Sequence, residues 1–165
     1  MQKVIPMKSK AYRAIAVNQI HLDRLLPQRH EALVHAGLDV GKDYILCVLR
    51  WANHDFERPW RCRNPADLAC LAHTLQRLAQ GRRLVVALEP TGTYGDALRQ
   101  ALQQADLMVH RVSPKAAADY AEIFDGVPSQ HDGKDAAVIA ELAATGQSDL
   151  WPFVLDAGCI SPPCG

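Results

Sequence analysis

The sequence predicts an α/β fold, with a mixed five-stranded sheet flanked by helices. Two apolar, β-rich runs, 33–40 and 44–51, follow each other with only a three-residue turn between them. A third run, 84–88, reads LVVAL and is typical of a strand covered on both faces. Helical patterns alternate with the later strands, as expected when helices pack on a sheet.

The first half of the chain predicts three strands and a helix. LVHAGLDV at 33–40 and YILCVLRW at 44–51 form a predicted hairpin, and a third strand is expected at 56–63, weakened by Pro59. Asn64-Pro65 has the pattern of a helix N-cap followed by proline. Leucines at helical spacing follow, and Gly81 ends this helix; they are Leu68, Leu71, Leu75 and Leu78.

The second half predicts alternating elements: a helix at 94–105, a strand at 107–112, and helices at 115–124 and 132–144. With a right-handed crossover, the strand at 84–88 returns beside the first strand and pairs with it in parallel, which is the RNase H arrangement. We therefore expect three parts: a basic N-terminal extension (1–30), an RNase H-like domain (31–153), and an irregular tail (154–165) that resembles a truncated end.

Composition excludes several classes of protein. The chain has 165 residues, enough for one domain with a proper core, and it contains no apolar run long enough for a membrane span and no signal-peptide pattern. Its five cysteines show no CxxC spacing, which argues against a disulfide scaffold or a zinc knuckle and favours a reducing compartment. We expect a cytoplasmic protein with no membrane partner.

The zero net charge conceals an asymmetry. Of 18 basic and 18 acidic residues, six basic and one acidic fall within residues 1–30, so the leader is basic and the body mildly acidic. A basic leader is able to contact phosphates, and a solvated or disordered extension explains it equally well.

Four carboxylates stand out as candidate metal ligands. Asp39 lies inside an apolar strand and Glu89 ends another, and a carboxylate in such a place is costly unless it is paired or binds a metal. Asp132 and Asp135, three residues apart, lie on one face of the predicted last helix. Each has a simpler reading: a turn residue for Asp39, an arginine partner for Glu89, and N-terminal capping acids for the helical pair. Together they form the oxygen-rich set that Mg²⁺ or Mn²⁺ uses in phosphoryl transfer.

Four segments also resemble a known family. They are His35–Asp43, Ala87–Tyr94, Val112–Lys115 and His131–Ala136. In this order they are similar to the motifs of insertion-sequence transposases with a DEDD tetrad, the family related to the Piv invertase. The resemblance implies a RuvC-like RNase H fold, divalent-metal-dependent DNA strand cleavage and transfer, and Asp39, Glu89, Asp132 and Asp135 as the tetrad. It further implies a DNA partner, a structured guide-like RNA, a homo-oligomer and a location at the bacterial nucleoid.

The chain departs from the family pattern in two ways. Gln130-His131 replaces the usual Lys-Thr before the third acid. Family members are about twice as long, and nothing here matches the serine of their second domain, so we expect this chain to be the metal-binding half of a composite site.

Six residues are candidates for nucleic-acid contact: Thr91, Tyr94, Lys115, Lys134, Arg61 and Arg63. The alternatives are helix capping for Thr91, solvated surface lysines for Lys115 and Lys134, and a sheet anchored by tryptophans with arginines outside. Two other functions remain open: an ATP-binding domain of the actin and sugar-kinase type, suggested by Asp39-Val40-Gly41, and a non-catalytic remnant that only binds nucleic acid.

Overall fold

The computed structural model describes residues 13–90, 92–123 and 133–151. Their centre is a mixed sheet in the order β1-β4-β3-β2-β5-β6-β7. The strands are β1 (Ile15–Ala16), β2 (Leu33–Val40), β3 (Tyr44–Trp51), β4 (Trp60–Arg63), β5 (Arg83–Leu88), β6 (Met108–Arg111) and β7 (Asp149–Leu150). The helices are η2 (Val17–Gln19), α1 (Leu22–Leu25), η3 (Leu26–Gln28), α2 (Leu68–Leu78), α3 (Asp96–Gln104), α4 (Pro114–Ile123) and α5 (Lys134–Ala144).

The strand pairing confirms the predicted topology. β2 pairs antiparallel with β3 and parallel with β5, and β5 pairs parallel with β6. The five predicted strands therefore form the RNase H-like centre of the sheet. The two-residue strands β1 and β7 extend its edges beyond the predicted five, β1 by pairing in parallel with β4.

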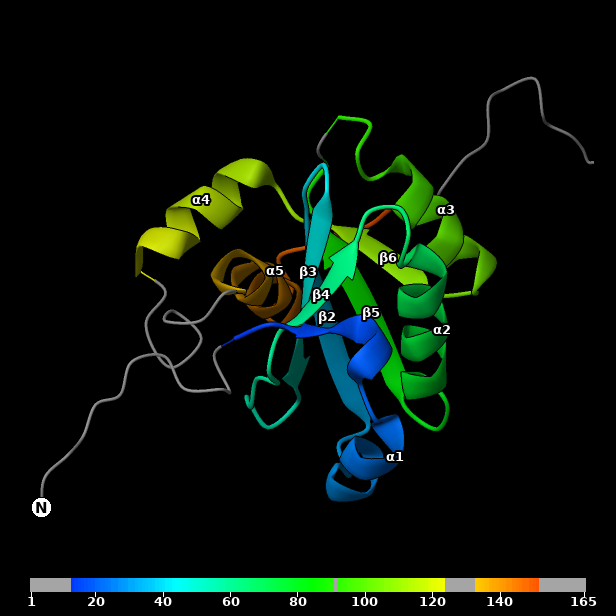
Figure 1. The fold of residues 1–165 in the computed structure, drawn as a ribbon. Coiled ribbons are helices and arrows are strands. Elements are labelled where there is room, and N and C mark those ends of the chain that lie inside the picture. The colour runs from blue at the N-terminus through cyan, green and yellow to red at the C-terminus, as the bar shows by residue number, and fades with distance from the viewer. Residues whose placement is uncertain (1–12, 91, 124–132, 152–165) are drawn as a thin grey trace, which may run out of the picture.

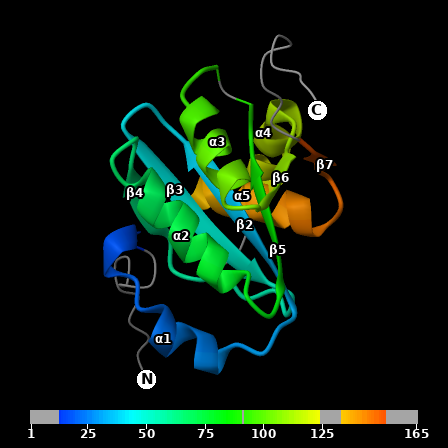
Figure 2. The same cartoon turned by 90° about the vertical axis from the view of Figure 1, so that its right-hand side faces the viewer.

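Helices cover both faces of the sheet (Figures 1 and 2). α2 and α3 lie on one face, and α5 with α4 lies on the other. Because side chains alternate along a strand, Val34, Ala36 and Leu38 of β2 join the apolar core under α2 and α3. Gly37 and Asp39 face α5 instead. The face of the sheet that α5 covers therefore carries Asp39, the strand carboxylate singled out in the sequence.

Several element boundaries differ from the prediction. The third strand is shorter than 56–63 and begins at Trp60, because Pro59 lacks an N–H for the ladder; Phe56 makes only an isolated bridge to Arg50. The first long helix begins at Leu68 and not after Asn64, whose side chain donates to the Gly41 carbonyl (2.9 Å). The expected N-cap role of Asn64 is therefore wrong.

Residues assigned to the basic extension contribute to the fold. Val17 and Leu22 are buried, and Val17 belongs to the main core. Arg29 stacks on the buried ring of Trp51, 4.9 Å from its centroid, and its guanidinium pairs with Glu57 (2.9 Å). Within the described residues, no helix is both long and apolar enough to cross a membrane.

Candidate metal centre

Three of the four predicted acids come from three different elements. Asp39 lies near the end of β2, Glu89 directly follows β5, and Asp135 is the second residue of α5. In the parallel ladder Leu38 pairs with Leu88, so Asp39 and Glu89 occupy the next positions on neighbouring strands. Adjacent strands lie about 4.8 Å apart, which brings the two carboxylates to the same end and face of the sheet.

A glycine allows α5 to bring the third acid to this place. A Cβ on Gly37 would lie 2.0 Å from the carbonyl oxygen of Ala136 and 2.6 Å from the amide nitrogen of Ala140. No side chain fits there, so the helix backbone rests directly on β2. Since Asp135 precedes Ala136 and Asp39 lies two residues beyond Gly37 on the same face, this close approach puts the two acids near each other.

The electrostatics of the three acids show the same proximity. The pKa of Asp39 is raised, first by loss of solvation on burial and then by the charge of Asp135. The pKa of Glu89 is raised by burial, then by Asp39, then by Asp135. Among the described residues, none of the three carboxylates has a hydrogen bond or ion pair with a basic side chain. Within the described residues, no positive side chain therefore offsets the repulsion between these carboxylates.

A pocket of about 260 Å³ opens beside this cluster. Glu89 and Asp135 lie in its wall, and α4 and α5 supply the rest, mostly small apolar side chains: Pro114, Ala117, Ala118, Ala121 and Val138. The polar groups therefore concentrate at one side of a hollow that is otherwise apolar.

The donor set fits a hard divalent cation, although the geometry is open. In the described part of the chain, no three His, Cys, Asp or Glu side chains converge closely enough to hold an ion. The fourth predicted acid, Asp132, lies outside the described residues, as does His131. Carboxylates that repel one another separate until a cation neutralises them, and Mg²⁺ or Mn²⁺ prefers such oxygen ligands.

Asp135, the described acid of the helical pair, makes no side-chain capping bond at the start of α5, although the helix dipole favours an acid in this turn. The N-cap of α5 is Gly133, with no side-chain capping bond, and Asp135 stands inside the first turn. The N-cap of α3 is likewise a glycine, Gly95, so Thr93 does not cap that helix with its side chain. Thr91 lies outside the described residues.

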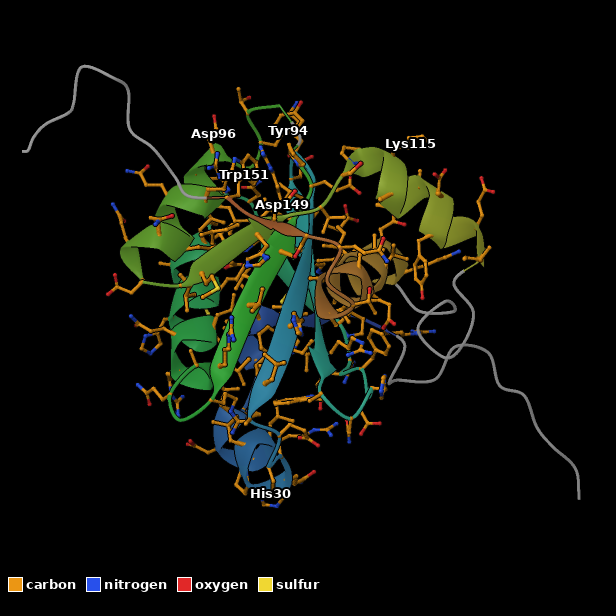
Figure 3. All side chains as sticks on the ribbon, turned by 180° about the vertical axis from the view of Figure 1, so that it is seen from behind. His30, Tyr94, Asp96, Lys115, Asp149 and Trp151 are labelled. Atoms are coloured by element: carbon orange, nitrogen blue, oxygen red, sulfur yellow. The ribbon has the colours of Figure 1, made fainter. Side chains whose placement is uncertain are left out.

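Three other candidate nucleic-acid contacts, Tyr94, Lys115 and Lys134, lie at the same end of the molecule as the acids. Figure 3 shows Tyr94 and Lys115 at the end of the molecule where β2 and β5 finish, with His30 at the opposite end. Tyr94 is 51% exposed. Lys115 is exposed on α4 and pairs with Asp119 one turn later (2.9 Å). Lys134 begins α5, next to Asp135.

Arg61 and Arg63 lie on the same sheet face as Asp39. Leu46 of β3 pairs with Asp39 on one side and with Arg61 on the other, so the three residues form one row across the sheet. Arg61 is exposed, and its guanidinium lies 5.7 Å from the ring centroid of Tyr44. Arg63 is exposed too, but it is engaged by Asp67.

Tyr44 is the residue that sequence reasoning missed. It is 52% exposed at the start of β3, and it pairs across the strands with Arg63. Only the antiparallel register reveals that this aromatic ring belongs with the arginines of β4. Three further aromatic or basic residues of β3 and β4, Arg50, Trp51 and Trp60, are buried.

Comparison with known proteins gives one family match. A family model, DEDD_Tnp_IS110, described as a transposase, matches residues 36–157. No curated protein matches the chain. Among solved structures, the chain is similar to RuvC of T. thermophilus in complex with a Holliday junction substrate, with 15% identity, a TM-score of 0.49, and coverage of 72% of this chain and 99% of that one. It is also similar to the large terminase nuclease of the thermophilic phage G20c, with 16% identity, a TM-score of 0.40, and coverage of 70% and 56%.

Proposed function

The chain belongs to the DEDD transposase family of the IS110 type, and from this premise we propose that Asp39, Glu89, Asp132 and Asp135 bind a divalent metal that drives cleavage and transfer of DNA strands. The family makes this a DNA-cleaving transposase domain. The metal, the residues that hold it and the activity of this chain by itself are the parts that we propose.

One observation carries the proposal. Asp39, Glu89 and Asp135 come from β2, β5 and α5, with no basic partner among the described residues; the charge of Asp135 raises the pKa of Asp39, and the charges of Asp39 and Asp135 raise the pKa of Glu89. A fold retains such a repulsive cluster at a cost in stability, and functional sites are where this cost is typically found. The reading as an ATP-binding domain has no comparable support, since the family match is to transposases.

The carboxylates have distinct places in the proposed reaction. Asp39 and Glu89, fixed on neighbouring strands, would hold the ion from the rigid sheet, and Asp135 would approach it from α5. Mg²⁺ or Mn²⁺ bound there supplies the positive charge that activates an attacking oxygen and stabilises the leaving oxygen of a phosphodiester. The apolar wall formed by α4 would limit the access of water to the side of Glu89 and Asp135.

Basic and aromatic side chains around the acids would hold the DNA. Arg61 and Tyr44, which extend the row that begins at Asp39, fit a backbone phosphate and a stacked base beside the cleaved bond. The DNA strand would also contact the other candidates around the acids: Arg63, Tyr94, Lys115 and Lys134. Thr91 belongs to this proposed set because it follows Pro90, next to Glu89. A structured guide-like RNA and a homo-oligomer extend the proposal, and they rest on the family resemblance.

Calorimetric titration of Mn²⁺ tests the metal centre directly. We expect the wild-type protein to bind Mn²⁺ and to gain thermal stability, because a ligand that binds only the folded state stabilises it. Asp39→Asn and Asp135→Asn should each weaken binding at least tenfold while the protein stays folded. The matched control is Asp119→Asn on the exposed face of α4, which should bind Mn²⁺ like the wild type.

Cleavage of a branched or nicked DNA by the same proteins, with and without Mn²⁺, tests the reaction. Unchanged Mn²⁺ binding in Asp39→Asn would contradict the assignment of the centre. Metal-independent cleavage would contradict the role of the ion.

A further inference from the structure

We propose that the ion pair between Arg50 and Glu141 holds α5 on the sheet and thereby positions Asp135 for metal binding. The inference rests on the proposed metal centre, since it assigns positioning residues to that centre. Neither Arg50 nor Glu141 belongs to the predicted acidic set or to the predicted nucleic-acid contacts.

The pair joins two elements that are far apart in the sequence. Arg50 lies on β3, and Glu141 lies in the last turns of α5. The Arg50 Nε donates a hydrogen bond to the Glu141 carboxylate, with an N–O distance of 2.5 Å. Their side chains are only 6% and 18% exposed. The same guanidinium also contacts His54 Nδ1 at 2.7 Å, which fixes it from the side of the β3–β4 connection. A charge-assisted bond that is shielded from water is stronger than a surface pair.

The opposite end of α5 needs such an anchor. There Asp135 faces two carboxylates of like charge, Asp39 and Glu89, and its own charge raises the pKa of both. Gly37 lets the helix backbone rest on β2, and buried apolar side chains of α5 strengthen this packing. Apolar packing is non-directional, however, and does not by itself fix the end of the helix where like charges repel. In the described structure, the ion pair that ties α5 to the sheet is the one at Glu141.

The spacing along the helix keeps the anchor apart from the metal ligands. Glu141 lies six positions after Asp135, a rise of about 9 Å along the helix axis. Arg50 is thus no metal ligand and no DNA contact, since it is buried at 5% exposure. Its influence on the centre would pass through the rigid helix, which makes Arg50 and Glu141 positioning residues.

The directions in which two single substitutions change the Mn²⁺ affinity distinguish positioning by the ion pair from a long-range effect of charge. If only long-range charge mattered, Arg50→Met would strengthen Mn²⁺ binding by removing a positive charge, and Glu141→Gln would weaken it by removing a negative one. If the pair positions Asp135, both substitutions weaken binding, by about tenfold as is typical when a supporting group behind a metal ligand is removed. Calorimetric titration of Mn²⁺ against each folded variant, with folding checked by circular dichroism, gives the two signs. Arg50→Lys, which keeps the charge and part of the pair, should lie between wild type and Arg50→Met.

Glu57→Gln is the matched control for lost stability. Glu57 is 19% exposed and pairs with Arg29, which adjoins His30 at the end of the molecule away from the carboxylates (Figure 3). The substitution Glu57→Gln should lower the thermal stability of the protein and leave its Mn²⁺ affinity unchanged. Tighter binding in Arg50→Met, or an equal loss of affinity in Glu57→Gln, would overturn the inference. If Asp39→Asn also leaves the affinity unchanged, the proposed metal centre itself is wrong; if only the pair variants leave it unchanged, the positioning alone is wrong.

Discussion

The backbone of Ala136 lies directly against Gly37, so close that a Cβ on the glycine would stand 2.0 Å from the Ala136 carbonyl oxygen. This contact joins α5 to β2 between two acids, Asp135 on the helix and Asp39 on the strand. The spacing of the helix from the sheet is therefore set by the absence of one side chain.

Gly37→Ala should destabilise the protein and weaken Mn²⁺ binding. The added methyl group has no room, and a rigid backbone on each side must shift, which costs about 1–3 kcal/mol in well-packed interiors. Urea denaturation measures the loss of unfolding free energy, and calorimetry measures the affinity.

Gly146→Ala provides the comparison for this substitution. Gly146 has a positive φ of 83° and open space around its Cα, so alanine there costs only backbone strain. It should be destabilised while Mn²⁺ binding stays as in the wild type. A Gly37→Ala protein with wild-type stability would mean that α5 moves away from β2 at no cost.

Asp39→Asn should stabilise the metal-free protein although it removes a metal ligand. The charged carboxylate is half-buried and faces Asp135, so the neutral amide relieves both desolvation and repulsion. Thermal unfolding without divalent ions should show a higher Tm than wild type, and added Mn²⁺ should reverse the order. A lower Tm in both conditions would indicate that Asp39 has a stabilising partner instead.

The stability of the protein should fall as the pH drops from about 6.5 towards 4, in part because of His35. This histidine is 7% exposed under α5, and burial, followed by the charge of Arg50, lowers its pKa to about 4. The unfolded chain then binds a proton at a higher pH than the folded one, so the contribution is complete above pH 6.5 and is lost below it. The expected loss between pH 7 and pH 5 is about 1–2 kcal/mol.

The variant His35→Gln isolates this effect from the rest of the protein. Urea denaturation at pH 7, 6 and 5 should show a smaller loss of stability than in wild type, whereas His73→Gln, at an exposed position on α2, should show the same loss. Asp39 and Glu89, whose pKa values are raised, act in the opposite direction and are present in all three proteins. Equal slopes in wild type and His35→Gln would show that folding does not lower the pKa of His35.

Tyr44→Ala and Arg61→Ala should each weaken DNA binding. Loss of one stacked base costs about 1–3 kcal/mol, and loss of one phosphate contact reduces the salt dependence by about one unit of slope. Fluorescence anisotropy with labelled DNA at several salt concentrations separates the two effects. Arg77→Ala, on α2 across the sheet, should bind like wild type, and an equal loss there would point to nonspecific charge.

Much of the fold follows from local patterns. The strands 33–40 and 44–51 agree with β2 and β3 to the residue, and Gly81, with a φ of 82°, lies in the turn that follows the end of α2 at Leu78. Where the prediction is wrong, at Asn64, a distant partner decides the outcome, because the Asn64 side chain bonds to the carbonyl of Gly41 in the turn between β2 and β3.

The sequence by itself identified Asp39 and Glu89 as candidate ligands, because a charged carboxylate inside or at the end of an apolar strand costs free energy unless it is paired or bound. The parallel register decided that these two are neighbours, and the contact of Gly37 with α5 decided that Asp135 joins them. The arginine row with Tyr44 and the buried pair of Arg50 with Glu141 are likewise products of tertiary structure. Both depend on which residues meet across strands and helices many positions apart, and a sequence specifies such meetings only through the packing of the whole fold.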